Sequence, residues 1–272
     1  MAIGILKFIL PLIYFIIVWT YGKAFFKSWK SAEALKSPLL YLLLLLHFLY
    51  LILRTVTFSH PPITKVFEIM TVVAFSISLA YAYIELRTKV KGTGYFILMV
   101  PFFFQLISSV FIKDLLIVPD ILRSNLLGFH VTSALLGFSA ITISAIYGML
   151  YLMLYHDIKS NRFGVVYQRL PNLEILERMS FSATKFGFVF LTIAIVVGII
   201  WLPKAFENFS YTDPKLIGTG FIWLLYGIGL LAKWFAKWQG KKIVWLSIVG
   251  FIISFFSMTI VNMFFSGFHK FN

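Results

Sequence analysis

Apolar runs of 18 or more residues recur along the chain, and they constrain its fold more than any other feature. An α-helix needs a run of this length to cross the roughly 30 Å hydrocarbon core of a bilayer. Within lipid, every backbone polar group has to be satisfied inside the chain, which favours helices. Only 12% of the 272 residues are charged, about half the share usual in soluble domains. The sequence therefore predicts an all-α, polytopic membrane protein.

We expect about eight transmembrane helices, which form a single transmembrane domain over residues 1–272. The predicted helices span residues of about 3–21, 38–56, 66–85, 94–112, 129–155, 183–202, 216–236 and 243–266. The fifth of these has a face of glycine, alanine and serine, which is typical of a closely packed, central helix. Between the fifth and sixth, the stretch LPNLEILERM has the spacing of an amphipathic helix lying under the bundle.

The cations are unevenly divided between the connecting segments. The chain has 24 Lys and Arg against 10 Asp and Glu, and sixteen of those cations fall in the connections that follow odd-numbered helices. Positive loops stay in the cytoplasm, so both termini are predicted to lie outside it. Topology thus explains the positive charge, and no nucleic acid is expected as a partner. We expect a multi-pass protein of the cell inner (cytoplasmic) membrane, in contact with the lipid bilayer.

The chain contains no cysteine. This excludes disulfides, thiol relays and iron–sulfur ligation by its own residues.

The segment Trp201–Lys215, WLPKAFENFSYTDPK, is a short aromatic loop between two apolar segments. The charge rule places it outside, with three histidines at outer helix ends, His60, His130 and His269. Two interpretations are open. The loop and histidines form one outer site, or the aromatics are an interfacial belt and the histidines ordinary interface residues.

His47 lies near the middle of the second apolar segment. An ionisable group at that depth usually faces the bundle interior or a cavity. It is either a neutral imidazole hydrogen-bonded to a neighbouring helix or a buried ligand. A transporter with His47 as a proton-coupled site is a third functional class, but the chain lacks the inverted repeats and broken helices of such folds.

The second outer turn reads HPPITKVFEIM. Pro61 and Pro62 end the preceding helix. We expect Thr64 to cap the next helix and Glu68 to complement its dipole.

Several motifs together resemble one known family. They are HPPITKVFEIM, GFHVTSALLGF, LPNLEILERMSFSATKFGFVFLTIAIVVGIIW, DPK, FIWLLYGIG and FSGFHKF. In this order they are similar to the cytochrome c assembly family, the CcsA/ResC/CcmC and HemX-like membrane proteins. The resemblance covers roughly residues 47–272.

The resemblance implies a haem-handling protein of cytochrome c maturation, of the system II CcsA-like kind. Haem b would be held non-covalently at the outer face, with His130 and His269 as axial ligands. The other implied positions are a platform of Trp201, Phe206, Phe209, Tyr211 and Asp213, propionate contacts at Arg123, Lys204, Lys215 and Lys270, and possible further ligands at His60 and His47. Implied partners are apocytochrome c and a ResB/Ccs1-like membrane protein. No catalytic residue is expected, and the chain is at most a component of a haem lyase.

The chain departs from the family's tryptophan-rich WWD loop. The family's tryptophans fall on Trp201, Phe206, Ser210 and Thr212, and its inner histidine falls on Leu231. This degenerate loop is similar to that of the short, eight-helix HemX-like branch. The alternative function is therefore a HemX-type regulator of haem biosynthesis that acts through the cytoplasmic segment 157–185.

Overall fold

The computed structural model describes residues 2–88, 90, 92–114, 124–205 and 212–257, and every regular element in these ranges is helical. The helices are α1 (Ala2–Lys27), α2 (Lys30–Phe58), α3 (Val66–Thr88), α4 (Gly94–Phe111), α5 (Asn125–Lys159), α6 (Val165–Arg169), α7 (Leu173–Ala205), α8 (Pro214–Trp234) and α9 (Lys241–Phe256). The predicted all-α class is confirmed.

Within the described residues, seven helices are long and apolar enough to cross a membrane: α1 to α5, α7 and α8. The polytopic prediction is therefore confirmed. The eighth predicted segment, 243–266, coincides with α9 as far as Phe256, and its end lies beyond the described range. The outward orientation of both termini stays a prediction.

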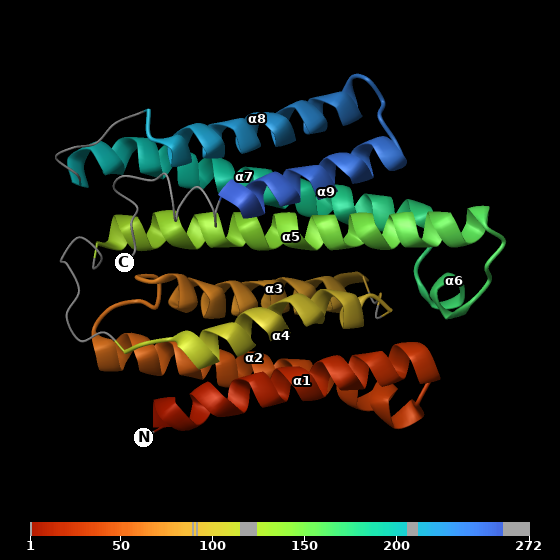
Figure 1. Cartoon of the computed structure of the whole chain (residues 1–272), viewed down its shortest axis with the longest axis horizontal. Coiled ribbons are helices and arrows are strands. Elements are labelled where there is room, and N and C mark those ends of the chain that lie inside the picture. The colour runs from red at the N-terminus through yellow and green to blue at the C-terminus, as the bar shows by residue number, and fades with distance from the viewer. Residues whose placement is uncertain (1, 89, 91, 115–123, 206–211, 258–272) are drawn as a thin grey trace. The chain divides into compact units, whose positions relative to one another are not determined.

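The helices divide into two compact units (Figure 1). Unit 1 comprises Met1–Arg123 with Gln168–Leu170, and so contains α1 to α4. Unit 2 comprises Ser124–Tyr167 and Pro171–Asn272, and contains α5, α7, α8 and α9. That these units act as a single transmembrane domain stays a prediction.

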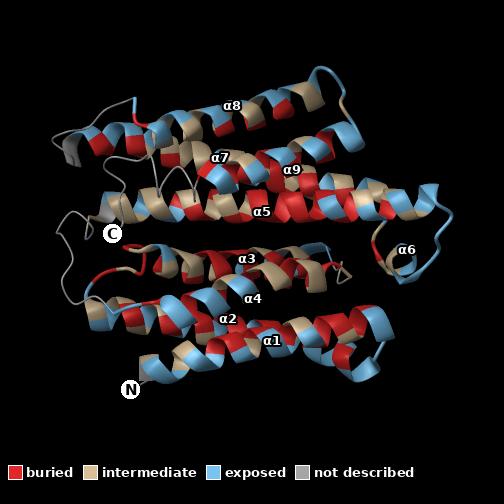
Figure 2. Cartoon of the chain, viewed as in Figure 1, coloured by how far each residue is buried: buried red, intermediate tan, exposed pale blue. Residues whose placement is uncertain are grey.

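In unit 1, α1 packs against α2 and α4, and α3 packs against the same two helices. Each helix turns a buried stripe toward its neighbours and an exposed apolar face outward (Figure 2). Exposed apolar faces of this kind suit a lipid environment. Lipid tails are as apolar as these side chains, so burying them inside the protein would not lower the free energy.

The helix α2 begins at Lys30, eight residues before the predicted start, and passes through Pro38. A proline removes one backbone donor and usually marks a helix boundary. Here the turn before it is stabilised by an ion pair of 2.6 Å between Lys36 and Glu33. Lys36 is only 3% exposed, so its aliphatic stem is packed as part of the helix rather than solvated.

The residues Gln168–Leu170 join unit 1 through Arg169. Its guanidinium donates hydrogen bonds to the backbone carbonyls of Ala24 and Phe25 and to the hydroxyl of Ser28. The last carbonyls of a helix lack intrahelical partners and attract positive charge. Arg169 thus caps the C-terminus of α1.

In unit 2, α5 and α7 make close backbone contact through two glycines. A Cβ atom at Gly187 would lie 2.8 Å from Cγ1 of Ile141, and one at Gly137 would lie 3.2 Å from the backbone nitrogen of Leu191. The predicted small-residue face of α5 is therefore confirmed at Gly137. Small residues allow such approach in membrane helices, where backbone proximity is a main source of association.

The helix α7 runs without a break from Leu173 to Ala205. Separate amphipathic and transmembrane helices were expected here, and that expectation is wrong. Asn172 caps the start of this helix, because its side-chain oxygen accepts a 2.9 Å hydrogen bond from the backbone N–H of Ile175. The first turns of this helix are fixed further by Glu177, which accepts a 2.8 Å hydrogen bond from the N–H of Gly240 and pairs with Lys233.

Candidate functional site

His130 lies in the second turn of α5, in unit 2. Its half-buried imidazole places Nδ1 at 2.8 Å from the backbone carbonyl oxygen of Ala194 in α7. A carbonyl only accepts hydrogen bonds, so Nδ1 carries the proton, and the lone pair of the neutral ring lies on Nε2. This tautomer, with one nitrogen oriented by a carbonyl, is the one common in metal-binding histidines.

The imidazole of His130 rests against a glycine of α7. A Cβ atom at Gly198 would lie 3.0 Å from Cε1 of His130 and 3.2 Å from Nδ1. Any side chain at position 198 would therefore push the ring. The position of His130 depends on both the Ala194 carbonyl and this small residue.

The segment Trp201–Lys215 has one buried residue of interest at each of its described ends. Trp201, near the end of α7, is 7% exposed, and Asp213, just before α8, is 6% exposed. The N–H of Ile217 donates to the carbonyl of Asp213 at 3.1 Å, which makes Asp213 the N-cap of α8. Aspartate at the N-cap and proline directly after it both favour a helix start. The motif DPK thus has a local structural role in addition to any role at the site.

Several predicted site residues cannot be placed. Phe206, Phe209, Tyr211, Arg123, His269 and Lys270 lie outside the described residues, as do the side chains of Lys204 and Lys215. Their roles stay predictions.

His60 belongs to unit 1 and lies in the turn between α2 and α3. It is 3% exposed. Its Nδ1 lies 3.0 Å from the backbone oxygen of Pro61, so this nitrogen also carries the proton. The turn begins at Ser59, whose left-handed backbone (φ 57°) ends α2.

His47 is fully buried in unit 1, with both ring nitrogens hydrogen-bonded. Nδ1 lies 3.0 Å from the hydroxyl of Tyr14, and Nε2 lies 2.9 Å from that of Thr71. The Thr71 hydroxyl donates to Gln105 at 2.6 Å, so it accepts from Nε2–H, and Nδ1 accepts from Tyr14. Coordinating a metal would break one of these bonds. The arrangement favours the structural interpretation of His47.

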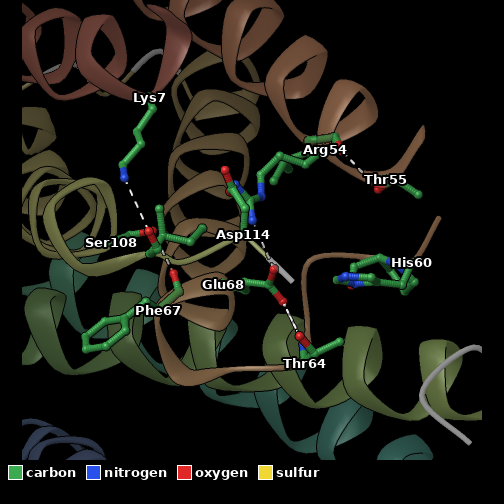
Figure 3. Close-up of polar contacts among 12 residues, drawn as sticks. Lys7, Arg54, Thr55, His60, Thr64, Phe67, Glu68, Ser108 and Asp114 are labelled. Carbon is green, nitrogen blue, oxygen red and sulfur yellow. Dashed lines mark hydrogen bonds and ion pairs between the residues drawn. The ribbon is translucent and has the colours of Figure 1, made fainter. Parts of the chain in front are cut away.

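A buried ion pair is the main feature that sequence reasoning missed (Figure 3). Arg54 in α2 and Glu68 in α3 are each 1% exposed, with Nη2 at 3.1 Å from Oε1. The other Glu68 oxygen accepts from the backbone N–H and the hydroxyl of Thr64. Thr64 does not cap α3, because the first intrahelical bond runs from Ile69 to the carbonyl of Lys65. The available signal was an arginine inside an apolar segment with an acid in the next one.

These features define a class of protein: a polytopic helical membrane protein with a histidine fixed by a backbone carbonyl in each unit. Comparison with known proteins then narrows the class. The sequence profile described as "Cytochrome C assembly protein" matches residues 32–269. The chain therefore belongs to the cytochrome c assembly protein family, as its motifs predict.

Individual relatives agree with this membership. The chain is 25% identical over 238 residues to "Cytochrome c biogenesis protein CcsA" of Guillardia theta, a match that covers 80% of this chain and 79% of the relative. It is 25% identical over 260 residues to the protein of the same name from Heterosigma akashiwo, with 82% and 80% covered. It is 30% identical to "Protein HemX" of Bacillus subtilis over 120 residues, 44% of each chain.

Proposed function

We propose that this protein handles haem during cytochrome c maturation and holds haem b at the outer face of the cytoplasmic membrane. His130 and His269 would be its axial ligands. Membership of the cytochrome c assembly family over residues 32–269 carries this proposal. The chain would act as a positioning component for haem rather than as a source of catalytic side chains.

The geometry at His130 supports a ligand role. The Ala194 carbonyl fixes the tautomer in which Nε2 holds the lone pair, and neutral imidazole is a common haem ligand. The ring is held by two elements that pack through glycines, so its orientation is set before any ligand arrives. Such preorganisation reduces the loss of freedom on binding.

The outer loop is the proposed platform. Trp201 is buried at its start, and Asp213 begins α8 at its end. Phe206, Phe209 and Tyr211 would offer aromatic surface to the porphyrin, while the lysines and arginine of the outer face would neutralise its propionates. Apocytochrome c and a ResB/Ccs1-like membrane protein are the partners that this function requires.

Visible spectroscopy of the detergent-purified protein tests the proposal. We expect a haem Soret band with sharp reduced bands, lost or shifted in the double variant His130→Ala/His269→Ala. The matched control is His156→Ala, since His156 is exposed at the opposite end of α5. A band that survives the double variant would move the ligands to His60 or His47. No haem in any variant, even after adding hemin, would overturn the proposal.

A HemX-type regulatory role is the second candidate, favoured by the 30% identity to HemX. It would act on a haem-biosynthesis enzyme through the segment 157–185. Arg169 is engaged in capping α1, whereas Arg162 and Arg178 are exposed. Co-purification of a haem-pathway enzyme that is lost in Arg162→Ala/Arg178→Ala and kept in His130→Ala would support this role over the first.

A further inference from the structure

The α8–α9 turn, residues 233–245 of unit 2, carries exposed aromatic rings and exposed lysines within one short stretch (Figure 2). Trp234 at the end of α8 is 64% exposed, and the next residue, Phe235, is 81% exposed. Trp245 in the second turn of α9 is 52% exposed. The exposed lysines of the same stretch are Lys237, Lys241 and Lys242. Such rings and cations together are typical of the headgroup region of a bilayer, where a ring meets hydrocarbon and a cation meets phosphate.

No carboxylate among the described residues neutralises these three lysines. None of them lies within ion-pair distance of a described acid, and the sequence has no aspartate or glutamate after Asp213. Glu177 of α7 contacts the α8–α9 turn, but the N–H of Gly240 and the ammonium group of Lys233 already engage its carboxylate. The α8–α9 turn therefore has three positive charges that an anion outside the chain can neutralise.

The backbone of the α8–α9 turn is held at both ends by hydrogen bonds. The N–H of Trp238 donates to the carbonyl of Ala232 at 3.2 Å, which closes the chain back onto α8. At the other end, the N–H of Gly240 donates to Glu177 at 2.8 Å, and its carbonyl accepts from the N–H of Val244 in α9. The lysines thus project from a defined backbone, which reduces the ordering that binding requires.

Two of the lysine ammonium groups rest against rings. Nζ of Lys241 lies 3.7 Å from the centroid of the Tyr155 ring, and Nζ of Lys242 lies 5.9 Å from that of the Trp238 ring. A ring attracts the positive charge but offers no oxygen, so it orients the ammonium group while N–H donors stay available to an acceptor. Tyr155 belongs to the C-terminal part of α5, whereas His130 lies near the N-terminus of that helix. The α8–α9 turn is therefore separate from the proposed haem site.

Lys237 has a backbone conformation that lysine rarely adopts. Its φ is 52°, in the left-handed region where a Cβ atom raises the energy and glycine is the usual residue. Lysine at this position therefore lowers the stability of the fold relative to glycine. Strain of this kind is found most often at functional positions. The charge rule for membrane topology requires cations in this connection, but it does not require one at the strained position.

We propose that the α8–α9 turn binds the phosphate headgroups of anionic phospholipids through Lys237, Lys241 and Lys242. The exposed rings beside these lysines lie at the boundary between headgroups and acyl chains. A free phosphate ion neutralises the charge but leaves the rings in water, so a lipid fits both parts of this surface. The charge selects anionic over zwitterionic lipid, because each lysine near an anionic surface contributes a factor of about five in affinity.

Native mass spectrometry of the detergent-purified full chain, titrated with phosphatidylglycerol or with phosphatidylcholine, tests this site. We expect the chain to bind phosphatidylglycerol more tightly. The variant Lys237→Gln/Lys241→Gln/Lys242→Gln should lose about tenfold or more in affinity for phosphatidylglycerol. Its affinity for phosphatidylcholine should not change. Equal affinity of the wild-type chain for the two lipids would overturn the proposal.

The matched control is Lys159→Gln/Arg162→Gln/Arg178→Gln. It removes the same amount of charge from three exposed cations of unit 2, in a segment that also contains Asp157 and Glu174. This variant should keep its affinity for phosphatidylglycerol. An equal loss in the two triple variants would show that net charge, and not the α8–α9 turn, attracts the lipid.

Lys237→Gly separates lipid binding from folding. Glycine adopts this φ without strain, so the midpoint of thermal unfolding in detergent should stay the same or rise. Affinity for phosphatidylglycerol should fall about fivefold. Unchanged affinity would overturn the contact between Lys237 and phosphate. Glycerol phosphate at the concentration of the lipid should not displace phosphatidylglycerol, and displacement would overturn the lipid as the ligand.

Discussion

The core of unit 1 is joined by an ion pair and by hydrogen bonds between long polar side chains, whereas the α5–α7 contact of unit 2 relies on glycines and short hydroxyls. In unit 1, Arg54 and Glu68 meet across α2 and α3. In unit 2, Ser144 and Thr184 meet across α5 and α7 at 2.7 Å, next to backbone contacts at Gly137 and Gly187. Long polar partners specify which helices pair, while small residues set how closely they approach. The two units should therefore respond differently to substitution.

The largest effect is expected at the ion pair of unit 1. Glu68→Leu leaves Arg54 without its buried partner, which costs about 3–5 kcal/mol. The double variant Arg54→Leu/Glu68→Leu removes both charges and should recover most of that stability. Unfolding in mild detergent, followed by circular dichroism, measures both. A double variant as unstable as the single one would contradict this view of unit 1.

His47→Leu should have the next largest effect. It removes one hydrogen bond each from Tyr14 and Thr71, which keep their bonds to Ser78 and Gln105, so we expect a loss of about 1–3 kcal/mol in the free energy of unfolding. The Soret band of bound haem should keep its position and intensity. Loss of the band in a folded His47→Leu protein would show that the imidazole is a ligand and not a structural element.

In unit 2 the comparable test is overpacking. Gly187→Leu places a side chain against Ile141 and should lower the free energy of unfolding by about 1–3 kcal/mol. No charged group takes part in this contact. Gly220→Leu is the control, since a Cβ atom at Gly220 meets nothing within 4 Å. Thermal unfolding of the two variants should separate them, and equal behaviour would argue against close α5–α7 packing.

The smallest change in stability is expected for Gly198→Ala. Alanine adds helix propensity but presses on the His130 ring at 3.0 Å, so the net change should stay below about 1 kcal/mol. Hemin affinity should nevertheless fall about tenfold, because the ligand is displaced. Gly220→Ala should leave hemin affinity as it is. Unchanged affinity in Gly198→Ala would separate His130 from haem binding.

The apolar runs predicted the helices well, because spanning length and hydrophobicity are local properties. The helix ends were less predictable. Pro38 suggested a boundary, but α2 starts at Lys30 and contains the Lys36–Glu33 ion pair before this proline. For α7, the Asn172 cap begins one continuous helix well before the apolar run.

The candidate site was predicted by residue type but not by environment. Nothing in the sequence indicates that Nδ1 of His130 bonds the carbonyl of Ala194, 64 positions away. Similarly, Glu68 lies in the first turn of α3, as expected for a residue that complements the helix dipole, but its pairing with Arg54 from another helix was not predicted. Long-range partners of this kind follow from tertiary packing, which a single sequence does not encode in local patterns.

The hydrogen-bonded chain through His47 draws one side chain from each helix of unit 1. Tyr14, His47, Thr71 and Gln105 come from α1, α2, α3 and α4 in turn. Opening any one helix would leave buried groups of the others without partners. The four helices should therefore open together, as one cooperative unit. Backbone amides deep in α1, α2, α3 and α4 would then exchange with solvent deuterium at a common slow rate.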